Sequence, residues 1–360
     1  MSQYISHLIR LKQECGVMQH EINELQPGTT LAIFDFKKKW MSMYYREAQV
    51  DFFAKAGKAW GGLAVVRKVP LPPGQLTFEG LSYRIETRMF DIISNDGCED
   101  FVSVSATIET GLRIIKQEYP EVERTKLFLD GAGALAGAAT LRELSLYGVR
   151  FGLVIVSVFV CVSGDGKTAL DGHFAYAMMI IWLYVVAGKG KQDITDAQSV
   201  VNSQQTNGGI KGSQALQIRF AREHMPDKKK MPKVKDIGSI CRRELQYDAQ
   251  LGLTGVKLRR HSHLGPGRFM SRELLFGTFR DTWPADGTRI ETLTRGSAPD
   301  TSNSSVIRDD ETKRRSAKAK TDRHLQHNTN IKQKARNNDE QIEAFQAASP
   351  LFYCKHRDTD

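Results

Sequence analysis

Runs of apolar residues separated by turn signals divide the first half of the chain into predicted strands and helices. Over 3–25 the apolar residues recur at three- and four-residue steps, which predicts an amphipathic helix that Pro27 and Gly28 end. The continuous apolar run at 31–34 then predicts a short buried strand over 30–36. The same patterns predict strands over 60–69, 81–93, 126–129 and 149–162 and helices over 100–119, 135–147 and 168–186.

The order of these elements indicates the fold class. Three consecutive strands, followed by helices that alternate with strands, predict a mixed sheet covered by helices. Few folds share this order, and the ribonuclease-H-like fold is the best known of them. We therefore predict an α/β fold, a ribonuclease-H-like mixed five-stranded sheet flanked by helices, in which the first and fourth strands are neighbours.

Composition divides the chain into four predicted segments. Residues 1–29 hold the N-terminal helix, and 30–222 hold the core, which also includes a helix near 195–205 and a strand near 215–220. A basic stretch at 227–235 belongs to a small C-terminal unit over 223–294. From 295 to 360 the chain is rich in Ser, Asn, Lys and Asp and poor in large apolar residues, which predicts a disordered tail.

Two apolar runs, 151–162 and 174–187, invite the question of whether the chain crosses a membrane. A spanning helix needs about 18 to 20 apolar residues. Both runs are shorter, and the polar residues 164–167 separate them. We therefore expect a buried strand and a buried helix, and no membrane partner.

The cysteines and the N-terminal residues exclude some classes of protein. The five cysteines lie far apart and form no CxxC pair, so neither a zinc ribbon nor a disulfide framework is expected. A reducing compartment is the default for such a pattern. The first residues contain no basic region that leads into an apolar run, so no secretory signal is expected either.

The charge of the chain favours a polyanionic partner. Lys and Arg number 51 against 41 Asp and Glu, for a formal net charge of +10, and the isoelectric point is near 9.3. This excess favours partners such as DNA or RNA, although ribosomal contacts, an acidic membrane or a basic tail would give the same sum. The basic run at 313–320 predicts a nuclear address, with a cytoplasmic one as the alternative, because such runs in tails are also common as solvating charge.

Three aspartates lie at the ends of predicted elements. Asp35 ends the first strand, Asp130 follows the fourth, and Asp171 begins the helix after the fifth. Adjacent first and fourth strands would place Asp35 and Asp130 side by side, and the helix would bring Asp171 across from them. Phosphoryl transfer uses such carboxylates to hold two Mg²⁺ or Mn²⁺ ions about 4 Å apart. The three residues are our predicted catalytic and metal-binding set.

Each acid also has a plainer interpretation. Asp35 is the hardest to dismiss, because an unpaired carboxylate in an apolar strand is costly, yet it could be a strand-end cap. Asp130 before Gly-Ala-Gly also fits an ordinary turn. Asp171 could be an exposed helical acid, and Asp165 competes with it for the third position.

Basic and aromatic residues near these acids predict contacts with nucleic acid. The residues that we assign to such contacts are Lys37, Lys38, Lys39, Arg46 and Lys167. Trp40, Tyr44 and Tyr45 could stack on bases, although aromatics after a strand more often belong to a core. His173 could assist a metal or a proton transfer, but a lone His at a helix start is more often a polar surface residue.

A phosphate-binding loop is the competing interpretation of 164–168. Its Gly-Asp-Gly-Lys-Thr sequence follows an apolar strand and precedes a helix, as a nucleotide-binding loop does. The spacing fails, however, because the position that needs the first glycine is Cys161.

Several short motifs, in this order along residues 5–275, carry a family resemblance. They are Ile33-Phe34-Asp35-Phe36-Lys37, Tyr45-Arg46-Glu47-Ala48-Gln49, Trp60-Gly61, Asp130-Gly131-Ala132-Gly133, Gly166-Lys167 with Asp171, Gly208-Gly209-Ile210-Lys211-Gly212 and Leu264-Gly265-Pro266-Gly267-Arg268-Phe269. With them the chain resembles a family of uncharacterised transposon-derived eukaryotic proteins and, more loosely, the DDE/D transposases with a ribonuclease-H-like core. The resemblance implies a DNA strand-transfer or nuclease ancestry, with Asp35, Asp130 and Asp171 at the positions of the acidic triad. The Cys/His zinc-finger segments frequent in that family are not evident here.

Three functional hypotheses follow. The leading one is a Mg²⁺-dependent polynucleotidyl transferase or nuclease of transposase type that acts on DNA, with a homo-oligomer as a possible assembly. The second is a catalytically inactive, nucleic-acid-binding descendant of a transposable element. The third is a P-loop-like nucleotide-binding protein that uses Gly166, Lys167 and Thr168.

Overall fold

A computed structural model of the chain contains one mixed sheet flanked by helices. The structure describes residues 12, 16–45, 55, 57–161, 168–187, 192–206, 209–222, 232–248, 252–260, 266–277 and 290–295. The strands are β1 Thr29–Trp40, β2 Lys58–Pro70, β3 Tyr83–Ser94, β4 Arg124–Leu129, β5 Val154–Val160, β6 Ser213–Phe220, β7 Arg242–Tyr247, β8 Leu253–Arg259, β9 Arg268–Ser271 and β10 Ile290–Arg295. The helices are α3 Phe101–Glu118, α4 Ala138–Arg150, α5 Ala169–Ala187, α6 Ala197–Gln205, α7 Arg272–Phe276 and the 3₁₀ turn η4 Ile237–Ser239.

The strand order in the described part of the chain is β10-β6-β3-β2-β1-β4-β5-β7-β8-β9. The first three strands form an antiparallel meander. Helical crossovers then bring β4 parallel to β1 and β5 parallel to β4. The α/β class, the mixed sheet and the adjacency of the first and fourth strands are therefore confirmed.

The predicted size of the sheet is wrong. It has ten strands in the described residues rather than five. The segment predicted as a small basic C-terminal unit, 223–294, supplies β7, β8 and β9 at the β5 edge and most of β10 beside β6. These strands use the unpaired backbone groups at both sheet edges. Of the tail predicted over 295–360, only Arg295, the last residue of β10, lies within the described residues.

Several element boundaries also differ from the prediction, and two of the differences have a clear physical reason. The first strand was expected to end at Phe36, but β1 runs on to Trp40, because Lys37 and Trp40 pair with residues of β2. Helix α4 was expected to end at Gly148, but it continues to Arg150. A Cβ at Gly148 would lie 2.8 Å from the Leu153 carbonyl oxygen, so the glycine serves close packing rather than termination.

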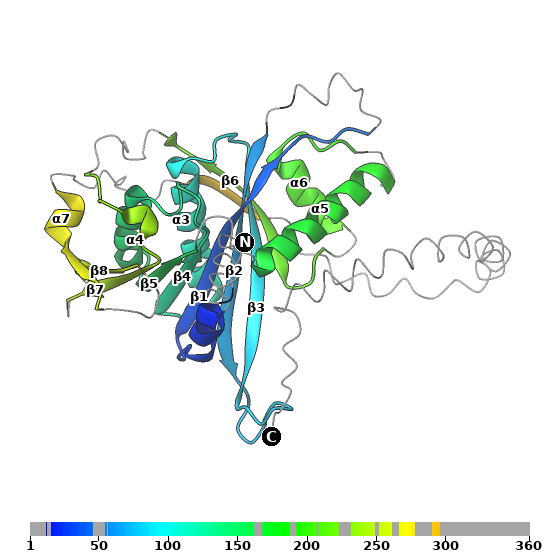
Figure 1. The fold of residues 1–360 in the computed structure, drawn as a ribbon. Helices are drawn as coiled ribbons and strands as arrows, with labels where there is room; N and C mark the ends of the chain where they lie inside the picture. The colour runs from blue at the N-terminus through cyan, green and yellow to red at the C-terminus, as the bar shows by residue number, and fades with distance from the viewer. Residues whose placement is uncertain are drawn as a thin grey trace, which may run out of the picture. The chain divides into compact units, whose positions relative to one another are not determined.

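The two faces of the sheet carry separate apolar cores. On β1, Ala32 and Phe34 pack with α3 and α4, whereas Leu31 and Ile33 pack with α5 and α6 (Figure 1). This is the side-chain alternation of a strand that is buried on both faces. The next odd-numbered residue, Asp35, therefore projects toward α5.

The N-terminal segment is described only in part. Residues 16–23 are helical, and Val17 and Met18 pack into the core on the α5 face. Apart from residue 12, the rest of the helix predicted from residue 3 lies outside the described residues.

Helix α5 departs from the prediction of a mostly buried helix. Within the described residues it is the one helix that is long and apolar enough to cross a membrane, over Ala169–Val186, and 33% of that span is buried. A core helix passes the same test of length and composition. The side turned from the sheet nevertheless exposes large apolar side chains: Tyr176, Met179, Trp182, Leu183 and Val186. The strand predicted over 149–162 is buried as expected, as β5.

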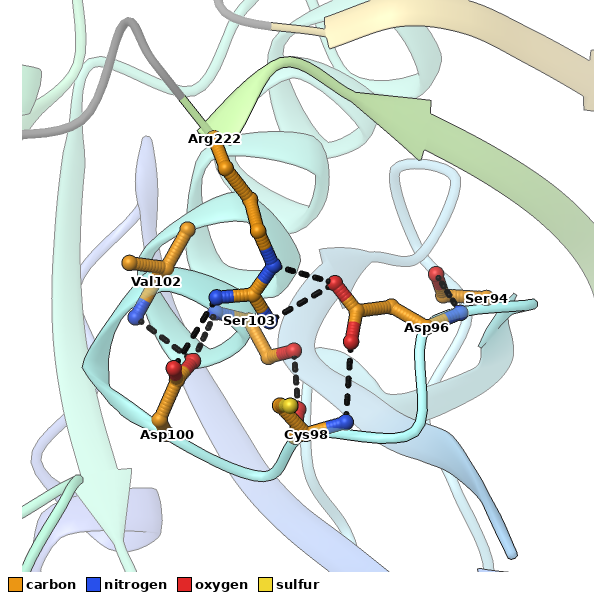
Figure 2. A network of polar contacts seen from close by, with 7 residues as sticks. All are labelled: Ser94, Asp96, Cys98, Asp100, Val102, Ser103 and Arg222. Atoms are coloured by element: carbon orange, nitrogen blue, oxygen red, sulfur yellow. Dashed lines mark hydrogen bonds and ion pairs between the residues drawn. The ribbon is translucent and has the colours of Figure 1, made fainter. Parts of the chain in front are cut away.

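An arginine ties the end of β6 to the loop between β3 and α3 (Figure 2). Arg222 donates to Asp96 Oδ2 at 2.7 Å and to Asp100 Oδ2 at 3.0 Å. Asp100 is the N-cap of α3, and its other oxygen accepts from the backbone N–H groups of Val102 and Ser103. One guanidinium thus joins the end of β6 to the helix that covers one face of the sheet.

Gly111 of α3 offers a test of this packing. In a helix, Gly→Ala ordinarily stabilises by about 0.5–1 kcal/mol. At Gly111 an added Cβ would lie 2.6 Å from the ring of Phe34 and 3.0 Å from Leu63. Because both neighbours are buried, we expect Gly111→Ala to lower the free energy of unfolding by about 1–3 kcal/mol in urea titrations.

The matched control is Gly16→Ala, at a helical position with nothing within 4 Å of the new Cβ. It should leave stability unchanged or raise it. A stabilising effect at both positions would contradict the described packing of α3 on β1.

Candidate functional site

A row of residues crosses the first three strands on the face that α5 covers. Asp35 on β1 pairs with Gly62 on β2, and Gly62 pairs with Asp91 on β3. Two residues further along β1, Lys37 pairs with Trp60. Because directly paired residues project to the same face, the two aspartates, the lysine and the tryptophan share one surface of the sheet.

Asp35 lies inside β1 rather than at its end, and its side chain is buried. The residue is 8% exposed, and Oδ1 accepts from its neighbour's backbone N–H, that of Phe36, at 2.7 Å. Burial raises its pKa to about 7, and the carboxylates of Asp171 and Asp130 raise it as well, against the lowering effect of the Phe36 hydrogen bond. The other two acids of the predicted set therefore both act on the ionisation of Asp35.

Asp130 and Asp171, which both act on Asp35, belong to separate elements. Asp130 directly follows β4, is partly buried, and accepts from the Gly131 backbone N–H at 2.7 Å. Asp171 lies in the first turn of α5, is exposed, and accepts from the Thr168 backbone N–H at 2.9 Å. Each carboxylate keeps an oxygen outside these local bonds.

The donor set suits a hard divalent cation. Carboxylate oxygens are the ligands that Mg²⁺ prefers, and a cation would relieve the repulsion that raises the pKa of Asp35. Among the described residues, however, no three His, Cys, Asp or Glu side chains lie close enough together to form a metal-binding group. Asp130 and Asp171 are each near enough to Asp35 to raise its pKa, but the three acids are not gathered at ligand distance.

Gly62 lets α5 lie against the sheet between Asp35 and Asp91. A Cβ at Gly62 would meet Phe174 at 2.5 Å and Leu170 at 3.1 Å. Phe174 also packs edge-on against Trp60, with ring centroids 5.6 Å apart. The first turns of α5 therefore rest directly on the β2 backbone, which brings Asp171 toward Asp35.

A second polar cluster on the same face was missed at the sequence level. His173, expected as a surface residue, is buried, and its Nε2 lies 2.7 Å from Asp91 Oδ2. Trp60 Nε1 donates to the other oxygen of Asp91, also at 2.7 Å. Like Asp35, Asp91 is an aspartate inside an apolar run that predicts a strand. This pattern would have been enough to identify Asp91 as a candidate from the sequence.

The residues predicted to contact nucleic acid differ in exposure and in whether the structure describes them, and the predicted contacts themselves stay a prediction. Burial lowers the pKa of Lys37 to about 8, against the opposing effect of Asp91, and its ammonium lies 4.9 Å from the Trp60 ring centroid. Lys39 is exposed. The side chain of Lys38, and Arg46 and Lys167 as a whole, lie outside the described residues.

The structure places two of the aromatic residues differently, and it does not describe the predicted phosphate-binding loop. Trp40 is buried and belongs to the core, whereas Tyr44 is exposed with the Lys55 ammonium 5.1 Å from its ring centroid. The competing acid Asp165 and the glycine-lysine segment within 162–167 lie outside the described residues, so the nucleotide-binding hypothesis stays a prediction.

Comparison of the chain with protein-family models, curated proteins and solved structures gave no match. The resemblance to transposon-derived proteins therefore stays a prediction from the motifs. Geometry and electrostatics carry the functional argument.

The raised pKa of Asp35 predicts a dependence of stability on pH. The folded chain favours the protonated carboxyl, so this stabilisation is complete below the ordinary pKa of 3.8 and is lost as pH rises to about 7. Asp35→Asn resembles the protonated form at every pH. In the absence of divalent cations we expect it to melt at the parent temperature near pH 4 and at least about 2 °C higher at pH 8.

Asp236→Asn, at an exposed position with a left-handed backbone that Asn tolerates, is the control for this comparison. Its difference from the parent should be the same at both pH values. A pH-independent effect of Asp35→Asn, measured by calorimetry, would show that the carboxyl is not held protonated.

Proposed function

We propose that this protein is a Mg²⁺- or Mn²⁺-dependent polynucleotidyl transferase or nuclease of transposase type that acts on DNA. The five inner strands, in the order β3-β2-β1-β4-β5 with β1, β4 and β5 parallel, support a ribonuclease-H-like core. The outer strands are additions to that core.

One observation carries the proposal. Asp171 and Asp130, which lie far from Asp35 in sequence, both raise the pKa of the buried Asp35 carboxyl. A protein does not gain stability by placing a carboxylate in an apolar face beside two others, because desolvation and repulsion both oppose its ionisation. Such an arrangement is typical of a functional site.

In this proposal Asp35, Asp130 and Asp171 hold the cations. Two Mg²⁺ ions held by these carboxylates would supply charge stabilisation at the attacking and leaving oxygens of a phosphodiester. Burial keeps Asp35 in place on β1, while the turn after β4 carries Asp130 and the first turn of α5 carries Asp171. Lys37 projects from the same face and can contact a phosphate oxygen.

The excess of basic residues supports DNA as the partner. The net charge of +10 favours polyanions, and the exposed Lys39 continues β1 beyond the acids. A nuclear address, with the cytoplasm as alternative, and a possible homo-oligomer belong to the same proposal.

The catalytically inactive alternative has one observation in its favour. In the described residues the three carboxylates do not form a group close enough for shared metal ligation. A descendant that binds DNA without cutting it would tolerate such spacing. A DNA cleavage assay with site variants separates an active enzyme from an inactive DNA-binding descendant.

Purified protein is incubated with labelled plasmid and oligonucleotide DNA in Mg²⁺ or Mn²⁺, alongside Asp35→Asn and Asp130→Asn. We expect the parent to nick or join DNA and each variant to lose more than about 100-fold in rate, since even outer-shell partners of a metal account for 10–100-fold. Asp236→Asn, on an exposed residue, serves as the control and should keep the parent rate.

The possible results separate the hypotheses. Equal nicking by the parent and both site variants would rule out the acidic set. Tight DNA binding without cleavage in any metal would favour the inactive descendant. Saturable ATP binding that Lys167→Ala abolishes would instead favour the P-loop-like protein.

A further inference from the structure

A buried hydrogen-bonded pair, Asp91 and His173, lies beside the acids but outside their set. Asp91 is fully buried, and the side chain of His173 is 4% exposed. The two oxygens of Asp91 accept from Trp60 Nε1 and contact His173 Nε2, both at 2.7 Å. The Ser213 hydroxyl is more distant, 3.5 Å from the same histidine nitrogen.

This pair fixes the histidine ring. An ionised carboxylate only accepts hydrogen bonds, so Asp91 assigns a proton to Nε2 of His173 and holds the ring in one orientation. The alternative, an unpaired carboxylate in the core, is costly. A charge-assisted hydrogen bond at this depth therefore resists separation of α5 from β3.

The bond lies in the first turns of α5, two residues from Asp171. Two residues of an α-helix rise about 3 Å and differ in direction by about 200°. His173 and Asp171 therefore project in different directions from one rigid segment. Leu170 and Phe174 pack on Gly62 of β2. These apolar contacts hold the same part of α5 against the sheet as the hydrogen bond between His173 and Asp91 does.

Asp91 itself is not placed to join the acids. Gly62 separates it from Asp35, which puts the two aspartates two strand spacings, or about 10 Å, apart. Both oxygens of Asp91 are already engaged with Trp60 and His173. Its effect on the site is therefore indirect.

We propose that Asp91 and His173 are a positioning pair that fixes the first turn of α5 and so holds Asp171 near Asp35. The role of the pair in cation binding rests on the proposed function. Whether the pair holds α5 against the sheet can be measured independently of that function. A positioning role of this kind acts through another residue and involves no contact with substrate.

The test compares four full-length variants in two measurements. His173→Phe keeps a ring and removes the bond, and His173→Gln keeps a donor toward Asp91. The double variant Asp91→Asn with His173→Phe removes the buried charge while keeping an acceptor for Trp60, in case the single variant does not fold. Tyr147→Phe, which loses a buried hydrogen bond to the Ser105 carbonyl on the opposite face, controls for general destabilisation.

The measurements are hydrogen–deuterium exchange of peptides over 168–174 and Mn²⁺ binding followed by electron paramagnetic resonance. We expect His173→Phe and the double variant to exchange faster over these residues and to bind Mn²⁺ about 10- to 100-fold more weakly, the range typical of lost outer-shell partners. His173→Gln should stay close to the parent, and Tyr147→Phe should change neither quantity.

Unchanged exchange and unchanged Mn²⁺ affinity in folded His173→Phe would overturn the inference, as would an equal loss in Tyr147→Phe. If the parent binds no Mn²⁺ and cuts no DNA, the proposed function fails. The exchange measurement then still decides whether the pair holds the first turn of α5.

Discussion

The parallel pairing of β1 with β4 is the constraint on which the acidic site depends. It brings Asp130, which follows β4, beside the strand that carries Asp35. It also fixes which face each β1 residue presents, because a register change of one residue would turn Asp35 toward α3 and Ile33 away from α5. The apolar residues on both sides of β1 therefore determine the orientation of the acid.

Two aspartates in apolar strand runs reach stable burial in different ways. Asp91 has a hydrogen-bond donor on each oxygen, from Trp60 and His173. Asp35 has one backbone donor and two neighbouring carboxylates, and its pKa rises to about 7. The first arrangement is satisfied by the fold alone, whereas the second is relieved only by a proton or a cation. This difference separates a structural acid from a candidate functional one.

The inner sheet was predictable from the sequence because its signals are local. Continuous apolar runs identify β1 to β5, and their order with the helices indicates which strands are neighbours. The strand predicted near 215–220 is β6. Strands β7, β8 and β9 were missed, since they are short, carry charged residues such as Arg242 and Arg259, and are stabilised by pairing with an existing edge. The pattern of apolar residues within a segment does not show whether another strand is available to pair with it.

The candidate site shows the same limit. An aspartate in an apolar run marks Asp35 from sequence alone, but the burial of His173 depends on a strand 82 residues away. The exposed side of α5 was likewise unpredictable, because a uniformly apolar helix has no polar face to indicate its orientation.

The long connection between β1 and β4 also bears on how the chain folds. The Thr30 hydroxyl donates to the Thr125 hydroxyl across 95 residues of sequence. The local meander of β1, β2 and β3 can form early, but closing that loop must precede the parallel pairing, and such non-local pairing is slow. Until β4 arrives, β1 has an open edge that carries the apolar run around Asp35 and that another chain could pair with. The interval before β4 docks is therefore the stage at which aggregation competes with folding, and conditions that shorten it should raise the yield of folded protein.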